Sequence, residues 1–442
     1  MASRSALVVG AGIAGLTAAY RLSKRGVDVT VLEASERVGG RMSTDRRDGY
    51  LIDRGAQFLS DGYSVVRGLI SELGVGQHLT RVCGWTGTVR DGAVRRTNAG
   101  YPWTVATGGL LSWRDTFRMA RASFSLVRET RHLPLSDYSK WHMLDDADAA
   151  EWIAASFGRD ALEYVFEPML EGFYFQAPEQ MSRAWPAVMW SFGARRKGVT
   201  ALANGIGSLP EALGQKVKVR LAMPAEAIST AGSGVSVQTP AGTLQADHLV
   251  LATTASVARQ LYAPERDVEE RLLRTDYSAS MNISFAVPEG VSTARVPKDL
   301  YGVLIPRRER LVIAAIGVES HKGQRYVPQG ELLNVMLGGS AGSRLMQAPE
   351  GQVLAEVLPE LQRYFPGIDR RIEFAHFSRW AEAEPRSPVG RSRDLHQYRQ
   401  LWHLGMKVIL AGDYMGIPCT EGAAESGNWA ATALVERTAR VV

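Results

Sequence analysis

The first 41 residues constrain the fold of this chain more than any other stretch. Residues 6–9 form an apolar run that predicts a buried parallel strand, and residues 10–15 read GAGIAG, which has the spacing G-x-G-x-x-G. Residues 13–24 continue with a helical pattern. A second apolar strand, residues 27–32, ends at Glu33, about twenty residues after the glycines. This order of strand, glycine turn, helix, strand and acid predicts a dinucleotide site.

The three glycines of this motif have separate tasks. Gly10 allows a tight turn, Gly12 lets backbone amides approach a pyrophosphate, and Gly15 lets the helix pack closely on the strand. The phosphates then meet the positive end of the helix. Glu33 can accept both hydroxyls of an adenosine ribose. The residues assigned to the nucleotide in this segment are Gly10, Ala11, Gly12, Ile13, Ala14, Gly15, Glu33 and Ala34.

The residues after Glu33 indicate which dinucleotide the chain binds. Residues 36–41 read ERVGGR, and with the glycine motif they resemble the extended fingerprint of the superfamily of FAD-linked amine oxidases, protoporphyrinogen oxidases and phytoene desaturases. Gly39 and Gly40 expose backbone amides, and the Arg41 guanidinium suits a second phosphate or the flavin edge. The alternative is a glycine turn with a solvated arginine. The resemblance covers nearly the whole chain and implies an enzyme that binds FAD.

The resemblance places two later segments at the flavin. Residues 49–58 read GYLIDRGAQF and would return the chain under the flavin ring, with a plain strand and turn as the alternative. Asp413 looks like the family acid that holds the ribityl chain, and the helix that starts near residue 420 can stabilise negative charge on the flavin. The residues that the resemblance adds to the FAD site are Gly40, Arg41, Gly55, Ala56, Gln57, Phe58, Ala225, Trp380, Gly412, Asp413, Glu421, Gly422 and Ala423.

Two segments indicate the protoporphyrinogen oxidase-like subgroup. Residues 167–182, EPMLEGFYFQAPEQMS, and residues 380–390, WAEAEPRSPVG, are more similar to that subgroup than to the amine oxidases. The second segment departs from the pattern, because Arg386 and Ser387 replace the glutamine and tyrosine of the family. This departure puts a porphyrinogen substrate in doubt.

Three features distinguish the chain from the amine oxidases. Residues 277–287 contain no lysine, where those enzymes usually place one that reaches the flavin through a water. The position before the last helix, often part of an aromatic cage, holds Cys419, which we interpret as a small buried filler. No cysteine follows Trp380 in the loop that carries a covalent flavin link in some relatives. The resemblance therefore implies FAD that is held non-covalently.

The pattern of strands and helices predicts an α/β protein with a discontinuous nucleotide domain. Strands between residues 277 and 318 would form a second sheet. The predicted parts are a Rossmann-type FAD-binding domain (residues 1–62, 198–270 and 400–442), a mixed-sheet substrate-binding domain (residues 63–100 and 271–399) and a helical insertion (residues 101–197).

One helix of the insertion has an apolar stripe beside a basic one. Apolar residues recur there at steps of four and three, and arginines run along their flank. Such a helix can rest on a membrane surface, receive substrate carboxylates, or present an ordinary solvated face. The apolar positions are Trp113, Phe117, Ala120, Phe124 and Val127, and the basic ones are Arg114, Arg118, Arg121 and Arg128.

Composition narrows the classes of function. The 442 residues are 45% hydrophobic, and the formal charge of +5 is spread along the chain, which does not favour nucleic acid as a partner. No apolar run is long enough to span a bilayer, so we expect a cytoplasmic protein, with peripheral membrane contact as an open alternative. Cys83 and Cys419 form no disulfide framework, and the histidines have no metal-ligand spacing. The oligomeric state stays open.

The expected reaction is dehydrogenation of a bulky organic substrate by hydride transfer to flavin N5, with O2 as the acceptor. No triad or carboxylate pair demands a side-chain acid, base or nucleophile, so no catalytic residue is assigned. A protoporphyrinogen or coproporphyrinogen is the first substrate, and an amine or a polyene is the alternative. A redox-neutral isomerase or a binding protein on the same fold is a third reading, which the intact flavin motifs disfavour.

Overall fold

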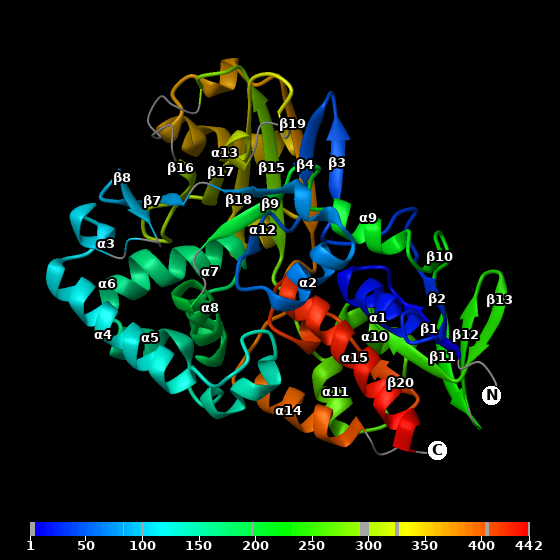
Figure 1. Cartoon of the computed structure of the whole chain (residues 1–442). Coiled ribbons are helices and arrows are strands. Elements are labelled where there is room, and N and C mark those ends of the chain that lie inside the picture. Colours follow the sequence, from blue (N-terminus) through cyan, green and yellow to red (C-terminus); the bar gives the residue numbers. More distant parts are fainter. Residues whose placement is uncertain are drawn as a thin grey trace.

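Three regions make up the molecule, and Figure 1 shows them as a nucleotide region at lower right, a large sheet at the top and a helical region at left. The computed structural model describes residues 5–82, 84–98, 101, 103–195, 198–232, 234–291, 300–322, 327–402 and 406–440. Cys83 therefore lies outside the described residues. The chain has an α/β fold, and the domain boundaries expected above stay a prediction.

The nucleotide region is built on a parallel sheet whose strands come from distant parts of the chain. β1 (Ser5–Val9) lies between β2 (Asp28–Leu32) and β14 (His248–Leu251), and β10 (Lys218–Arg220) and β20 (Val408–Leu410) form the edges. Every pairing in this sheet is parallel. The residues of β14 and β20 are buried along their whole length, as is typical of a parallel sheet.

Two helices from opposite ends of the chain pack on each other beside this sheet. In Figure 1, α1 (Ile13–Ser23) lies against α15 (Thr420–Arg440). Glycine makes the approach close enough, because a Cβ on Gly427 would lie 2.0 Å from the carbonyl oxygen of Ala14. A Cβ on Gly15 would likewise lie 2.0 Å from the carbonyl oxygen of Gly10. The packing task assigned to Gly15 thus follows from the backbone geometry.

Smaller sheets and helices complete this region. The antiparallel sheet of β11 (Ala227–Ala231), β12 (Gly234–Thr239) and β13 (Gly242–Ala246) projects at the right of Figure 1. The helix α2 (Ser64–Glu72) lies between the short strands β5 (Leu59–Ser60) and β6 (Leu79–Arg81) in the sequence. The other elements are β3 (Thr44–Arg47), β4 (Tyr50–Asp53), β9 (Val199–Leu202), α9 (Ser208–Gly214), α10 (Ala255–Leu261) and α11 (Asp267–Leu273).

The large sheet is mixed. Its pairings are antiparallel except that of β16 with β7, and the hairpin of β7 and β8 turns at Asp91 and Gly92, which have φ values of +53° and +70°. Apolar residues of α13 (Glu350–Tyr364) pack into its core, and α12 (Gly339–Leu345) lies beside them. The strand order is β19 (Phe374–Trp380), β15 (Ser280–Val287), β18 (Glu331–Leu337), β17 (Ile313–Val318), β16 (Leu300–Leu304), β7 (Trp85–Arg90) and β8 (Ala93–Asn98).

The helical region lies at the left of Figure 1 and has an aromatic core. Its largest buried side chains include Tyr138, Trp141 and Trp185. The helices are α3 (Thr104–Thr107), α4 (Trp113–Thr130), α5 (Ala149–Ser156), α6 (Arg159–Ala161), a π-helical segment (Leu162–Phe166), α7 (Glu167–Phe173) and α8 (Ala184–Arg195). Later in the chain, α14 (Arg391–Leu401) lies at the bottom of Figure 1 beside α11.

The apolar stripe of α4 faces outward. Met119 and Leu126 point into the core, whereas Trp113, Phe117 and Phe124 are 65%, 73% and 71% exposed. The sequence pattern therefore marks a surface of aromatic side chains, not the core contact that such a stripe usually makes. Among the described residues, none of the helices is long and apolar enough to cross a bilayer.

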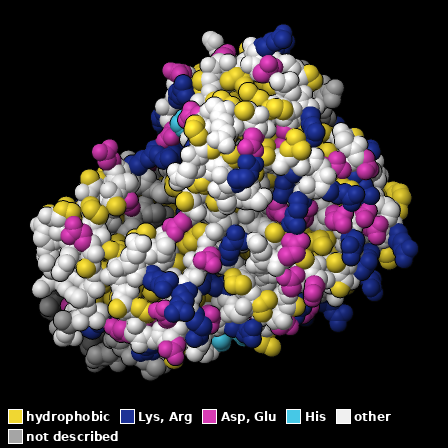
Figure 2. Space-filling model, turned by 180° about the vertical axis from the view of Figure 1, so that it is seen from behind, with side chains coloured by type: hydrophobic (Ala, Val, Ile, Leu, Met, Phe, Trp, Pro, Cys, Tyr) yellow, Lys and Arg dark blue, Asp and Glu magenta, His cyan; other side chains and the backbone are white. Residues whose placement is uncertain are grey.

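Charges of both signs cover the face opposite to that of Figure 1. Figure 2 shows Lys and Arg side chains interspersed with Asp and Glu over this face, with hydrophobic side chains in scattered groups. This mixture agrees with the modest formal charge of +5.

Candidate functional site

One cavity of about 800 Å³ runs from the glycine turn to a cluster of aromatic side chains. Its walls come from the nucleotide sheet, from β15, β18 and β19 of the large sheet, and from the segment that follows α7. We call the part around the glycine turn the nucleotide end and the part around Phe173, Tyr174 and Phe175 the aromatic end. The two ends belong to one continuous space.

At the nucleotide end the backbone is left open to the cavity. Gly10 has φ +102°, and a Cβ there would lie 2.7 Å from the carbonyl oxygen of Ala252. A Cβ on Gly12 would meet no protein atom within 4 Å, although Gly12 lines the cavity. Gly12 is also the N-cap of α1, and no side chain caps that helix. Its first amides are therefore available to an anion such as a pyrophosphate.

Glu33 stands at the carboxyl end of β2 and lines the cavity. One carboxylate oxygen accepts from the amide of Ala11 at 2.6 Å. The other accepts from the amide of Ser35 at 2.9 Å and from its hydroxyl at 2.8 Å. These bonds hold the carboxylate in the position where the ribose of a dinucleotide is expected.

Arg41 and Asp413 form an ion pair in the middle of the cavity wall. Arg41 also donates to the carbonyl of Ala383 at 2.8 Å, and the amide of Tyr414 donates to Asp413 at 3.0 Å. Burial alone would lower the pKa of Arg41, but the Asp413 carboxylate outweighs it, so the pKa is raised. The pair joins the fingerprint segment to the chain end, and its charged, hydrogen-bonding groups fit the phosphate and ribityl part of a flavin dinucleotide.

Gln57 and Trp380 are fixed in the wall that the resemblance assigns to the flavin ring. The Gln57 side chain donates to the carbonyls of Asp53 and Gly55 at 3.0 and 3.1 Å and accepts from the ammonium of Lys322 at 2.7 Å. The Trp380 indole donates to the carbonyl of Arg54 at 2.9 Å. Both side chains are thus held by groups behind the cavity, which leaves their remaining surface for a ligand.

The aromatic end collects side chains from separate elements. Phe58 packs edge-on against Phe173, with ring centroids 5.2 Å apart. Phe175 has φ +57°, a backbone conformation that non-glycine residues seldom adopt. Cys419 lines the same end, and burial raises the pKa of its thiol to about 12. Cys419 is therefore a protonated part of the cavity wall as well as the buried residue expected from the sequence.

Most residues assigned from the sequence meet at this cavity. Those that line it are Gly10, Gly12, Ile13, Ala14, Glu33, Ala34, Gly40, Arg41, Gly55, Ala56, Gln57, Phe58, Trp380, Gly412, Asp413 and Ala423. Those that the structure does not place in its lining are Ala11, Gly15, Ala225, Glu421 and Gly422.

The side chain of Glu421 has a structural task outside the lining of the cavity. Its carboxylate accepts from the first amides of α2, those of Ser64, Val65 and Val66, at 2.7, 2.9 and 3.0 Å. This side chain caps α2 and is fully buried. Gly422 packs against backbone, because a Cβ there would lie 2.1 Å from the carbonyl oxygen of Ile417. The start of α15 reaches the cavity instead through Thr420 and Ala423.

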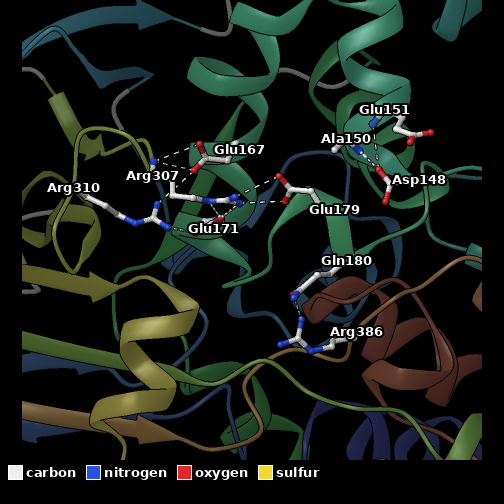
Figure 3. Close-up of polar contacts among 10 residues, drawn as sticks. All are labelled: Asp148, Ala150, Glu151, Glu167, Glu171, Glu179, Gln180, Arg307, Arg310 and Arg386. Carbon is white, nitrogen blue, oxygen red and sulfur yellow. Dashed lines mark hydrogen bonds and ion pairs between the residues drawn. The ribbon is translucent and has the colours of Figure 1, made fainter.

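Arg386 and Ser387, the residues that depart from the protoporphyrinogen oxidase pattern, do not line the cavity. The Ser387 hydroxyl lies 2.8 Å from the hydroxyl of Tyr138 in the core of the helical region. Figure 3 shows Arg386 bonded to Gln180. Both side chains attach the helical region to the segment after β19, so their departure from the family pattern is not a change in the cavity wall.

An ionic cluster anchors α7, the helix that ends at the aromatic end. In Figure 3, Glu171 pairs with Arg307 and Arg310, and Glu167 accepts from the amide of Arg307 at 3.1 Å. Arg307 also reaches Glu179 at 3.2 Å. Burial, together with the Glu171 carboxylate, raises the pKa of Glu167 to about 7. The cluster ties α7 to the loop after β16 and so positions the residues that follow α7.

Sequence reasoning did not assign several residues of the aromatic end to the site. The run of Phe173, Tyr174 and Phe175 was visible only as a subgroup pattern, and Tyr63 was not singled out. Alternation along β15 would have offered Ser280 and Asn282, whose neighbours Met281 and Ile283 face the sheet core. The remaining lining residues missed include Met42, Thr253, Thr254, Val257, Met336, Glu382, Glu384 and Thr420.

The comparisons with known proteins agree with this geometry. The family model described as "Flavin containing amine oxidoreductase" matches residues 13–435. The chain is 24% identical to coproporphyrinogen III oxidase of Bacillus subtilis (strain 168), over 94% of this chain and 92% of that protein. It superposes with a TM-score of 0.76 on a putative protoporphyrinogen oxidase from Exiguobacterium sp. 255-15, at 22% identity over 98% of this chain and 100% of that one. Cyclohexylamine oxidase from Brevibacterium oxydans IH-35A gives a TM-score of 0.75 at 20% identity, over 99% and 100% of the two chains.

The fold and the cavity, taken with these matches, define a flavin-dependent oxidoreductase. The chain belongs to the flavin-containing amine oxidoreductase family. The resemblance found in the fingerprint residues is thereby confirmed, including its likeness to the protoporphyrinogen oxidase group.

Proposed function

We propose that the protein binds FAD non-covalently and dehydrogenates a bulky organic substrate by hydride transfer to flavin N5, with O2 as the electron acceptor. The continuity of the cavity carries this proposal, since a nucleotide end and an aromatic end share one space of about 800 Å³. A cofactor anchored at the first end would place its reactive ring beside a substrate at the second.

In this proposal the chain orients and shields, and FAD supplies the hydride acceptor. The amides at the start of α1 and the Arg41–Asp413 pair hold the phosphates and the ribityl chain. Gln57 and Trp380 support the ring, and aromatic side chains exclude water from the substrate. Buried hydrophobic walls of this kind suit a bulky substrate.

Non-covalent attachment is supported by the cysteines of the chain. A thioether link needs a cysteine beside the flavin ring, and residues 381–390 contain none. Cys419 is the cysteine of the cavity, and its raised pKa of about 12 keeps the thiol protonated and poorly nucleophilic. We expect acid precipitation of the protein to release its flavin into the supernatant.

A porphyrinogen is the first candidate substrate, because a relative matched over 92% of its own length is named coproporphyrinogen III oxidase. An amine is the second candidate, and Glu384 in the cavity wall favours it. A polyene, which the resemblance to the superfamily also allows, is the third candidate.

The test is anaerobic bleaching of the purified yellow protein at the flavin absorbance band. The additions are protoporphyrinogen, coproporphyrinogen and a panel of primary amines, each offered alone. We expect one class to bleach the flavin, and admission of air to restore the colour with release of hydrogen peroxide. A colourless protein, or a yellow protein that none of these compounds reduces, would contradict the proposed function.

We also propose that the outer face of α4 contacts a membrane surface that carries anionic lipids. Trp113, Phe117 and Phe124 present exposed aromatic rings, and Arg114 and Arg121 are exposed beside them. Aromatic rings partition into the headgroup region, and arginines pair with lipid phosphates. The protein would then be a cytoplasmic enzyme with peripheral attachment.

A further inference from the structure

The loop after β19 brings two carboxyl groups to the cavity, and they differ in their partners. The Glu382 carboxylate accepts a hydrogen bond from the hydroxyl of Ser256 at the start of α10. None of the described residues donates a hydrogen bond to the Glu384 carboxyl group or forms an ion pair with it. Glu384 is thus an acid that lines the cavity without a protein partner.

The backbone of Glu384 is held firmly. Its carbonyl accepts from the amide of Ser278 at 2.8 Å, and the amide of Ala383 donates to the carbonyl of Ser278 at 2.8 Å. The amide of Arg386 donates to the carbonyl of Asp276, also at 2.8 Å. Three bonds to one neighbouring segment fix the direction in which the Glu384 side chain leaves the backbone.

Among the residues that the structure describes, the lining of the cavity around Glu384 holds no unpaired Lys or Arg. Arg41 is the only Lys or Arg among the described residues that line the cavity, and it is already paired with Asp413 and bonded to the carbonyl of Ala383. Glu384 interacts electrostatically with Arg41 and Asp413 of the ion pair and with Tyr174 and Cys419 of the aromatic end. It therefore lies at the border between the nucleotide end and the aromatic end, beside the part of the cavity that would receive a substrate.

Ionising a carboxyl group that has no partner in such a place costs free energy, unless a ligand pairs with the carboxylate. Burial raises the pKa of Glu384 well above its usual range, the Asp413 carboxylate adds to the rise, and Arg41 opposes it. A cation would reverse this effect by pairing with the ionised carboxylate. The aromatic walls add to the fit, because the faces of Phe and Tyr rings attract cations.

We infer that Glu384 is a specificity-determining residue, whose carboxylate is the counter-ion for a positively charged nitrogen of the substrate. The inference rests on the proposed function, since it assumes that the aromatic end receives the molecule to be oxidised. It also goes against a substrate with several carboxylates, because those would meet Glu384 with no unpaired cation in the described lining of the cavity.

The experiment uses the yellow holoprotein and two unreactive ligands of the same shape. Benzyltrimethylammonium carries a permanent positive charge, and neopentylbenzene is its uncharged carbon isostere. Binding of each is followed through the change in the flavin absorbance spectrum. We expect the wild-type protein to bind the cation more tightly than the isostere, by about tenfold or more, because a positive charge beside a carboxylate in a partly buried site is attracted by charge alone.

The variant Glu384→Gln keeps the shape of the side chain and removes the charge. It should lose the preference for the cation while its affinity for the isostere is unchanged. Glu382→Gln is the matched control, because it removes a neighbouring carboxylate that already has Ser256 as its partner. This control should retain the preference of the wild type.

Each outcome bears on one claim. A yellow wild-type protein without preference for the cation overturns the role of Glu384 and leaves the flavin proposal standing. Equal preference in the wild type and in Glu384→Gln does the same. A colourless protein contradicts the flavin proposal itself. Faster bleaching by benzylamine in the wild type than in Glu384→Gln, with equal flavin content in both, would support the inference in turnover.

Discussion

The two ends of the cavity are built by different means. The nucleotide end takes most of its groups from residues 10–41 and from residues 412–413, and it uses backbone amides and one ion pair. The aromatic end gathers Tyr63, Tyr174 and Glu384 from three unrelated segments. A nucleotide site of this kind can be encoded locally, whereas a substrate site depends on which distant segments the fold brings together.

The largest effect is expected where a side chain would occupy the space that the phosphates of a dinucleotide need. Gly12→Val would place carbon atoms in the space that the phosphates need, and no protein atom lies within 4 Å to resist them. The apoprotein should therefore fold normally and be colourless. Far-ultraviolet circular dichroism and thermal unfolding would report the fold, and absorbance at the flavin band would report the cofactor.

Two other glycines serve as controls for this comparison. Gly15→Val should prevent folding, because a Cβ there would lie 2.0 Å from the carbonyl oxygen of Gly10. Gly68→Ala lies in α2, where a Cβ meets nothing within 4 Å, and should keep the colour and raise the free energy of unfolding by up to about 1 kcal/mol. A yellow Gly12→Val protein would show that the glycine turn does not hold the phosphates.

The difference between the two ends explains which parts of the fold and of the site could be predicted from the sequence alone. Local patterns gave close bounds for α1, expected over residues 13–24 and found at Ile13–Ser23. The family fingerprint located most of the nucleotide end. These successes share one cause, since each feature depends on neighbours within a few turns of the chain.

The residues whose surroundings the sequence does not reveal depend on long-range contacts. Glu421 caps α2, a helix more than 350 residues earlier in the chain, and no local pattern announces such a partner. Arg386 and Ser387 drew attention as differences from a family but lie outside the cavity lining. Glu384 stands two residues before Arg386 and lines the cavity, because the backbone bonds to Ser278 set its direction.

A substitution of Asp413 tests the ion pair that this residue forms with Arg41 at the nucleotide end. Asp413→Asn keeps the shape but leaves Arg41 without its counter-ion in a largely buried site. We expect FAD affinity to fall by about a hundredfold, since charged hydrogen bonds to the arginine are weakened. Isothermal titration of the apoprotein with FAD would measure the change. Asp394→Asn, which breaks the more exposed pair with Arg271, should leave FAD affinity unaltered.

Glu167 tests the support of the aromatic end. Its pKa of about 7 exceeds the usual 4.5, so the folded protein retains a proton that the unfolded chain releases between these values. The free energy of unfolding should therefore fall as the pH rises from about 4.5 to about 7, by up to about 3 kcal/mol, and then level off. Urea unfolding of the wild type and of Glu167→Gln across this range would measure the difference.

The Glu167→Gln variant has no proton to lose at this position, so its stability relative to the wild type should increase with pH. Glu163→Gln removes a carboxylate from the more exposed pair with Arg308 and serves as the matched control. The control should follow the wild-type pH dependence. If the free energy of unfolding changed with pH in the same way in the wild type and in Glu167→Gln, burial and Glu171 would not raise the pKa of Glu167 in the folded protein.

The outer face of α4 gives the smallest expected effect and extends the comparison to a third region. The spacing of its aromatic side chains can be recognised in the local sequence, as the nucleotide end can. What these side chains contact, however, depends on a partner outside the chain. A triple variant of Trp113, Phe117 and Phe124 to serine should fold as the wild type does, because these side chains are 65%, 73% and 71% exposed. Its flotation with phosphatidylserine vesicles at low salt should fall by about tenfold or more.

Leu311→Ser is the control for that experiment, since Leu311 is 62% exposed and belongs to the loop before β17, not to α4. It should float as the wild type does. High salt should weaken flotation of the wild type, because the arginines of α4 contribute through screened attraction to anionic lipid. A wild-type protein that stays with the soluble fraction at low salt would contradict the membrane proposal. The apolar stripe of α4 would then be only a solvent-exposed aromatic face.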